Sequence, residues 1–118
     1  MSFHFDNGTP IYLQIIESIK QDVICEKYLP NQKLPSVREL ALAFSVNPNT
    51  IQKALAELEE IGLIFTERTN GKFVTGDKTV IEKIKRETVQ KMVENFYNSM
   101  EKIGLNREEI FEILSKEK

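Results

Sequence analysis

Residues 44–55 read FSVNPNTIQKAL, a stretch that predicts a helix with an uncharged first turn. Asn47 can cap this helix, because its side-chain oxygen can accept a hydrogen bond from an unpaired backbone N–H, and Pro48 suits the first helical position. The core face then carries Ile51, Ala54, Leu55 and Leu58. Off this face, small polar residues surround the positive end of the helix dipole, namely Asn49, Thr50 and Gln52. We therefore expect another molecule to bind at this first turn.

The segments on either side of this helix predict a winged helix-turn-helix. The pattern Ser36-x-x-Glu39 is a capping box ahead of a short apolar helix face. Only residues 45–46 then precede the next helix, expected from about 47 to 61, and so tight a connection is typical of a helix-turn-helix. Extended runs follow at 63–67 and 72–75, and the Asn-Gly pair between them is a strong hairpin signal. A hairpin in this position is a wing.

A further helix is expected before this unit. It opens at Thr9-Pro10, ends near Glu26, and has apolar residues at helical spacing: Tyr12, Ile15, Ile16, Ile19 and Val23. Tyr12 is expected in the core. A very short extended piece is expected at Lys33-Leu34.

The region from Lys78 onward predicts a long charged helix that Gly104 ends, followed by a short helix capped by Asn106 with Glu109. The long helix carries a heptad seam of Val89, Val93, Phe96, Met100 and Ile103. The expected fold is thus mainly α with a small β-hairpin wing. A winged helix-turn-helix DNA-binding domain spans 1–76, and a two-helix C-terminal dimerisation arm spans 77–118.

The composition favours a cytoplasmic globular protein. No run of the 118 residues approaches a membrane span, and residues 1–7 lack the pattern of a secretory leader. One cysteine, Cys25, expected as a half-buried helix residue, and one histidine, His4, provide neither a disulfide nor a Cys/His metal cage, so no cofactor or metal is expected. The scattered acids provide no paired catalytic groups, so the chain is not expected to be an enzyme.

The net charge of −2 is unusual for a DNA-binding protein, but its distribution is uneven. Residues 40–56 contain no acid and one base, Lys53. Asparagine and glutamine can bind adenine through two hydrogen bonds, and threonine suits a base edge or a phosphate. We therefore expect double-stranded DNA as the partner, with base contacts from Asn49, Thr50 and Gln52, and Lys53 as a phosphate contact.

Two other groups extend this expected contact surface. Arg38 could reach a phosphate or a guanine edge, and Ser36 could either cap its helix alone or also bind phosphate. The hairpin tip could lie along the minor groove, through Thr69, Asn70, Gly71 and Lys72. A plain turn is the alternative for the tip.

Over residues 10–74 the chain resembles the GntR family of bacterial transcription regulators. The resemblance rests on Pro10-Ile11-Tyr12 with Ile15, KLPSVRELA at 33–41, Thr50-Ile51 with Ala54, Leu58, Gly62-Leu63-Ile64, and Gly71 with Phe73-Val74. The run VNPNTIQKA at 46–54, with a tail of two helices, is similar to the YtrA-type branch. This resemblance implies a repressor, often of operons that encode membrane transporters, with DNA contacts at Ser36, Arg38, Asn49, Thr50, Gln52 and Gly71.

The chain departs from the family pattern at three positions. Many relatives have arginines where this chain has Pro48 and Gln52, so a guanine-reading role does not carry over. Thr69 replaces the first glycine of the usual Gly-x-Gly in the wing. The depth to which the wing inserts is therefore left open.

The heptad seam would be a costly exposed stripe on a monomer, so we expect a homodimer that binds an inverted repeat with half-sites about one helical turn, or a multiple of it, apart. In one alternative, the long helix folds back on Tyr12, Ile16 and Ile19 of its own chain. In another, a ligand groove lies between the two arms, floored by Phe96, Tyr97 and Met100. The sequence indicates no particular small-molecule effector. The alternative function is a winged-helix module that binds protein without specific DNA binding.

Overall fold

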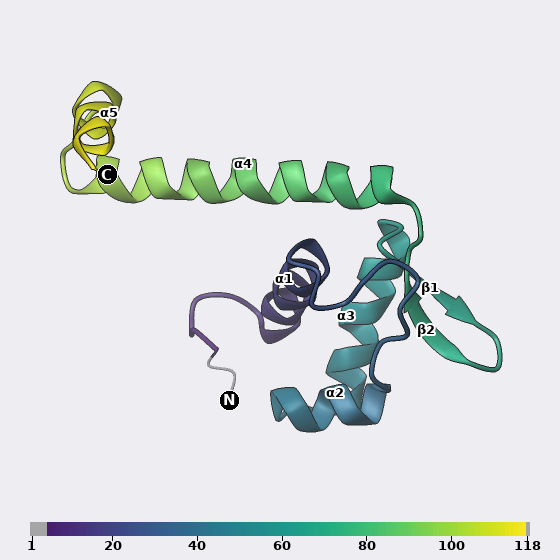
Figure 1. The fold of residues 1–118 in the computed structure, drawn as a ribbon. Helices are drawn as coiled ribbons and strands as arrows, with labels where there is room; N and C mark the ends of the chain where they lie inside the picture. The colour runs from purple at the N-terminus through teal and green to yellow at the C-terminus, as the bar shows by residue number, and fades with distance from the viewer. Residues whose placement is uncertain (1–4, 118) are drawn as a thin grey trace. The chain divides into compact units, whose positions relative to one another are not determined.

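The computed structural model describes residues 5–117, and its elements are labelled in Figure 1. In chain order they are α1 (Ile11–Ile24), α2 (Val37–Phe44), α3 (Pro48–Glu60), β1 (Ile64–Glu67), β2 (Gly71–Val74), α4 (Lys78–Lys102) and α5 (Arg107–Lys116). The expected fold, mainly helical with a hairpin after a helix-turn-helix, is confirmed. His4 and the start of the 1–7 segment lie outside the described residues. Over the part described, no helix is long and apolar enough to cross a lipid bilayer.

The chain forms two compact units, one ending at Lys83 and the other beginning at Ile84. The division falls inside α4, so the first turns of this helix belong to the N-terminal unit. One contact of these first turns is with the end of α3, since the Val80 side chain lies next to Gly62, 3.9 Å from where a Cβ on that glycine would be.

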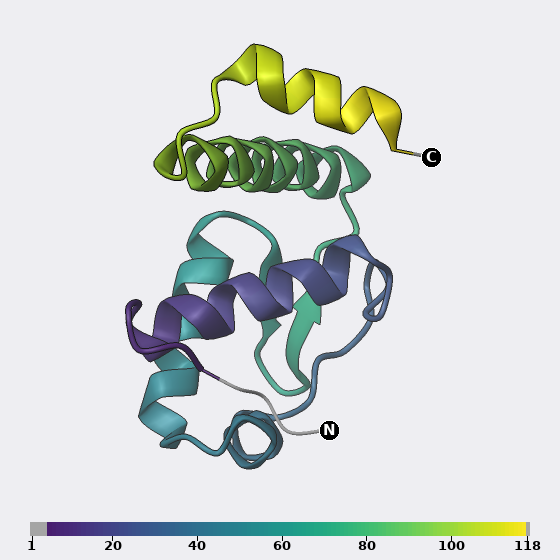
Figure 2. The ribbon, with the colours of Figure 1, turned by 90° about the vertical axis from the view of Figure 1, so that its left-hand side faces the viewer.

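The core of the N-terminal unit is formed by three helices and the base of the hairpin. Both α1 and α2 pack on α3, and α1 and α3 lie side by side in Figures 1 and 2. The buried residues are aliphatic: Ile15, Ile16, Ile19, Val23, Leu34, Leu40, Ala41, Ile51, Ala54, Leu55, Leu58, Leu63, Ile64 and Val74. Each large side chain of this kind contributes about 1.5–3 kcal/mol when fully buried. The α3 core positions expected from the sequence, Ile51, Ala54, Leu55 and Leu58, are all among these buried residues, so that prediction is confirmed.

The helix starts follow the expected capping chemistry. The Ser36 hydroxyl accepts a hydrogen bond from the Glu39 backbone N–H (3.0 Å), and the Glu39 carboxylate accepts one from the Ser36 N–H (2.9 Å). Asn47 caps α3 by accepting from the Asn49 N–H (2.8 Å), with Pro48 in the first turn. Asn106 and Glu109 form the same reciprocal box at α5. These local interactions set where the helices begin.

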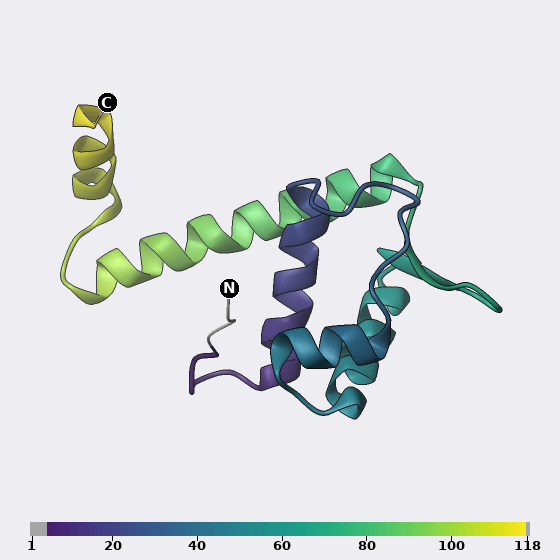
Figure 3. The same cartoon turned by 60° about the horizontal axis from the view of Figure 1, so that its bottom comes forward.

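The hairpin differs in detail from the expected one. Glu67 pairs with Gly71, so the loop is residues 68–70, and the Asn-Gly pair does not form a two-residue turn. Gly71 has φ +100°, a left-handed backbone conformation that glycine adopts at little cost and that suits the end of a three-residue loop. Lys72 therefore lies within β2, opposite Thr66, and not at the tip. Figure 3 shows the hairpin projecting from the helices of its unit.

A short segment before α2 lies on the other side of β2. The Leu34 N–H donates to the Lys72 carbonyl (2.8 Å), and the Val74 N–H donates to the Gln32 carbonyl (2.9 Å). Lys33 and Phe73 form the bridge between them. The extended piece expected at Lys33-Leu34 thus forms part of the sheet, and β2 is flanked on both sides.

Cys25 corrects one expectation. It is exposed and lies just after α1, where its Sγ is 3.7 Å from the Asp22 carbonyl. The helix ends at Ile24, and the chain turns sharply at Glu26, whose φ is +66°. Cys25 is therefore outside the helix and cannot share its half-buried face.

The C-terminal unit contains most of α4 together with α5. Arg107 connects them, since its guanidinium lies 3.2 Å from a Glu94 oxygen, 3.8 Å from a Glu101 oxygen and 4.4 Å from the ring centre of Tyr97. Ile110 of α5 is fully buried. The α4 seam is different, since large fractions of Val89 (50%), Val93 (47%), Phe96 (41%) and Ile103 (75%) are exposed in the single chain, and Met100 is half-buried.

Candidate nucleic-acid interface

The first turns of α3 present the expected polar residues at the surface. Asn49 and Gln52 are exposed, and Thr50 is half-buried. Ile51 and Leu55 anchor the opposite face in the core. The Asn47 cap engages the backbone N–H of Asn49, and the exposed side chains of Asn49 and Gln52 can meet an external partner. Their amides can both donate and accept, as base-edge recognition requires.

Lys53 lies apart from these residues. Its Nζ is 3.8 Å from the ring centre of Tyr12, which is half-buried and not the core residue expected from the sequence. An exposed cation–π contact of this kind stabilises by about 0.5–1 kcal/mol. The contact directs the Lys53 charge towards α1, away from the first turn of α3.

Ser36 and Arg38 lie at the N-terminal end of α2, and both are exposed. The pKa of Glu39 is below its usual value, mainly because its carboxylate accepts the hydrogen bond from the Ser36 backbone N–H. The capping box is therefore complete above the ordinary carboxyl pKa and is lost only as the pH falls through the lowered value. At neutral pH, the Ser36 hydroxyl is engaged as a cap, and Arg38 is exposed in the same first turn of α2.

Replacing Ser36 with alanine should lower the free energy of unfolding by ~1 kcal/mol, because the Glu39 N–H loses its acceptor. Urea denaturation measures this. Ser36→Asp is the matched control, since aspartate also caps but adds a negative charge. If Ser36 also binds phosphate, the aspartate variant should keep its stability and lose DNA affinity. Unchanged DNA affinity in that variant would restrict Ser36 to capping.

The hairpin loop brings together a partly different set of residues from those expected. Thr69 and Asn70 lie in the exposed loop, and Gly71 begins β2. Arg68, which sequence reasoning passed over, is exposed in the same loop. Arg68 could have been identified by considering a three-residue loop that begins after Glu67. The cation at the tip is thus Arg68, and Lys72 faces elsewhere.

Lys72 points back towards α3. Its Nζ lies 3.0 Å from Glu59 Oε1 and donates to Thr66 Oγ1 (2.7 Å), and the Thr66 hydroxyl donates to the same Glu59 oxygen (2.7 Å). These contacts hold the pKa of Glu59 below its usual value, the Thr66 hydrogen bond having the largest effect and Lys72 the next. The second half of α3 is thereby connected to both strands of the hairpin.

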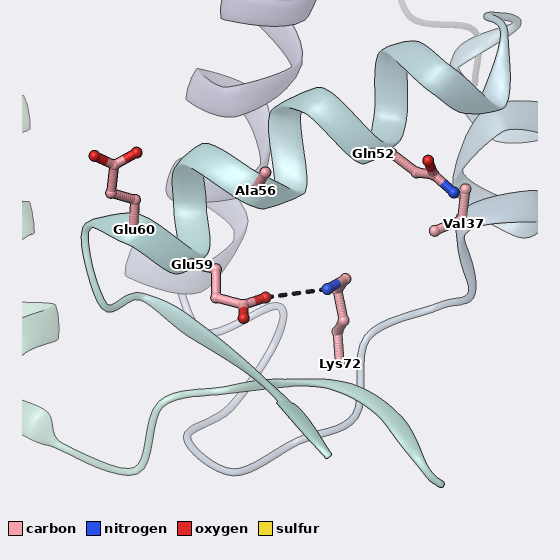
Figure 4. A pocket seen from close by; sticks show the side chains of 6 residues that line it. All are labelled: Val37, Gln52, Ala56, Glu59, Glu60 and Lys72. Atoms are coloured by element: carbon pink, nitrogen blue, oxygen red, sulfur yellow. Dashed lines mark hydrogen bonds and ion pairs between the residues drawn. The ribbon is translucent and has the colours of Figure 1, made fainter. Parts of the chain in front are cut away.

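A groove of about 510 Å³ runs along α3, between Val37 of α2 and Lys72 of the hairpin. Figure 4 shows the side chains that line it: Val37, Gln52, Ala56, Glu59, Glu60 and Lys72. Gln52 lies at one end, directed towards Val37 of α2, and the Glu59–Lys72 pair lies at the other. The groove therefore has both apolar and charged side chains in its lining.

A second hollow, of about 550 Å³, lies in the C-terminal unit and is lined by Tyr97, Phe111 and polar or charged residues of 106–112. Phe96 and Met100, expected to floor a ligand groove between two arms, are not among its lining residues.

A three-helix unit with a polar recognition helix and a projecting hairpin defines the class of winged helix-turn-helix proteins. The pattern described as "Bacterial regulatory proteins, gntR family" matches residues 11–74. The chain belongs to this GntR family, in its YtrA-type branch. The family consists of transcription regulators and not of enzymes.

Individual relatives agree with this assignment. The HTH-type transcriptional repressor YtrA of Bacillus subtilis is 37% identical over 109 residues, which cover 90% of this chain and 82% of the relative. A GntR family transcriptional regulator from Listeria monocytogenes is similar in structure, with a TM-score of 0.85 and 43% identity over 97% of this chain and 100% of that one. The DNA-binding domain of AraR in complex with operator ORE1 has a TM-score of 0.56 and 35% identity over 62% of this chain and 94% of that one.

Proposed function

We propose that the protein is a sequence-specific repressor that acts in the bacterial cytoplasm and binds an inverted-repeat operator as a homodimer. The observation that carries the proposal is the uncharged polar surface at the start of α3, where Asn49 and Gln52 are exposed and Gln52 lines a groove that it shares with Lys72 of the hairpin. The operator-bound relative supports DNA as the partner. The similarity to YtrA supports repression, and we further propose that the regulated operon encodes a transporter.

The proposed contacts divide by role. Asn49, Thr50 and Gln52 contact base edges in the major groove, and Arg38 contacts a guanine edge or a phosphate. Phosphate contacts come from Ser36, from Lys53 once it leaves the Tyr12 ring, and from Lys72 once it is released from its ion pair. The loop residues Thr69 and Asn70, with Gly71, approach the minor groove, where the exposed Arg68 adds the charge.

The proposed homodimer uses the arm at 77–118, and the DNA-binding domain is 1–76. Its support is the exposed seam on α4, to which the structure adds Met92, 56% exposed. An apolar stripe of this kind is costly in water and is typical of an interface between helices. A dimer would also double the number of base pairs contacted, which specific binding in a genome requires.

Selection of bound sequences from random duplexes tests the function directly. We expect an inverted repeat whose half-sites are about one helical turn, or a multiple of it, apart. The logarithm of the association constant for the selected duplex should then fall linearly with the logarithm of the salt concentration. The expected slope is about −0.9 per phosphate contacted. The alternative, a protein-binding module, is favoured by the net charge of −2 and predicts no selected sequence and a flat salt response.

A further inference from the structure

The cluster of Glu59, Thr66 and Lys72 joins α3 to both strands of the hairpin through side chains that water can reach. Thr66 and Lys72 are paired directly across the two strands, and both contact the same Glu59 oxygen. The side chains of Lys72 and Glu59 remain 28% and 41% exposed. Ion pairs with this exposure are weak, because water competes for both partners. Lys72 can therefore exchange Glu59 for another anion at little cost.

The position of the cluster indicates which anion that would be. If α3 enters a major groove and the hairpin follows the adjacent minor groove, one sugar–phosphate strand must pass between them. The groove between α3 and the hairpin contains Lys72 as its single lysine or arginine among the lining residues, together with Glu59 and Glu60. A phosphate that enters this groove therefore meets the Lys72 ammonium, whose charge is already balanced by the Glu59 carboxylate.

The donor capacity of Lys72 allows the exchange. A lysine ammonium has three N–H donors, and the contacts to Glu59 and Thr66 use two. A backbone phosphate can take the third and then replace the Glu59 carboxylate. The Thr66 hydroxyl can keep the ammonium in place during this step.

We propose that Glu59 limits the affinity for DNA by holding Lys72 in an ion pair, from which the ammonium passes to a backbone phosphate when DNA binds. This inference rests on the proposed DNA-binding function. Glu59 acts through Lys72 and is a positioning residue that sets affinity without contacting DNA. The attenuated phosphate contact leaves specificity to the base contacts at the start of α3.

The decisive variant is Glu59→Gln, which keeps an oxygen acceptor for Thr66 and Lys72 but removes the charge. On the selected duplex at fixed low salt, its Kd should fall about three- to fivefold below that of the unmodified protein. The salt slope should also become steeper, by up to about 0.9, since Lys72 then neutralises a phosphate without leaving a bare carboxylate. Fluorescence anisotropy over a salt series measures both quantities.

Glu60→Gln is the matched control, because Glu60 lines the same groove but points away from Lys72 in Figure 4. It should change Kd less than twofold, by the screening expected for an exposed charge. In a Lys72→Met background, Glu59→Gln should give no gain. Thermal melting of each variant checks that all are folded.

Three results would overturn the inference. Glu59→Gln could bind no more tightly than the unmodified protein, could gain no more than Glu60→Gln, or could keep its gain without Lys72. Each of these leaves the DNA-binding function intact, provided that the unmodified protein binds its selected duplex. A protein that selects no duplex would instead contradict the proposed function itself.

Discussion

Replacing Phe96 with glutamate should produce a monomer that keeps the melting transition of its winged-helix unit but loses tight operator binding. Phe96 lies in the middle of the seam and is 41% exposed in the single chain. A dimer would bury it, and a carboxylate buried there without a partner is strongly unfavourable. Because two linked half-site contacts bind far more tightly than one, the expected loss of affinity is about 10²- to 10⁴-fold. Sedimentation equilibrium and gel-shift titration measure the two effects.

The control for this variant is Asn98→Glu, which adds the same charge to α4 at an exposed position outside the seam. It should remain dimeric and bind the operator normally. If Phe96→Glu stays dimeric and still binds the inverted repeat, the arm is not the dimer interface. If the unmodified protein sediments as a monomer, the alternative in which the long helix folds back on Tyr12, Ile16 and Ile19 is favoured.

The second large effect is expected at the proposed base contacts. Arg38→Ala and Gln52→Ala should each weaken operator binding by about 1–3 kcal/mol if the side chain reads a base. Both residues are exposed and outside the core, so the helical content and the melting temperature should be unchanged. Gel shifts at fixed salt, with circular dichroism of the free proteins, measure this.

The two substitutions should also differ in kind. Loss of a base contact at Gln52 should relax the sequence preference at one position, whereas loss of a phosphate contact at Arg38 would weaken all sequences equally and reduce the salt slope by about 1. Gln21→Ala, at an exposed position of α1, is the matched control and should have no effect. Unchanged affinity in both Arg38→Ala and Gln52→Ala would contradict the assigned reading face.

The parts of the fold that could be predicted from the sequence are those determined by neighbouring residues. The Ser36–Glu39 and Asn106–Glu109 boxes involve residues three positions apart, so their patterns are visible in the chain itself. The α3 core face follows from helical spacing, and Gly62 ends the turn after α3 with φ +83°. Local chemistry thus determined where these elements begin and end.

The candidate site was harder to predict, because its geometry depends on contacts between distant residues. The Asn-Gly signal was misleading about the loop, since pairing of Glu67 with Gly71 moved Lys72 from the tip into β2. Its partner Glu59 is 13 positions away, and no local pattern connects them. The contact of Lys53 with Tyr12 likewise depends on how α1 packs on α3.

The pairing of residues 32–34 with β2 has a consequence for the shape of the DNA. Backbone hydrogen bonds fasten this segment to the hairpin, and only Pro35 separates it from Ser36 at the start of α2. In the proposed complex, the hairpin and the α2 end therefore cannot adjust their separation independently, so the duplex must adapt its groove width to the protein. Deforming DNA costs a free energy that depends on its sequence. Operators that are already narrow beneath the hairpin should be preferred, and the random-duplex selection would reveal them as A·T enrichment at base pairs that no side chain touches.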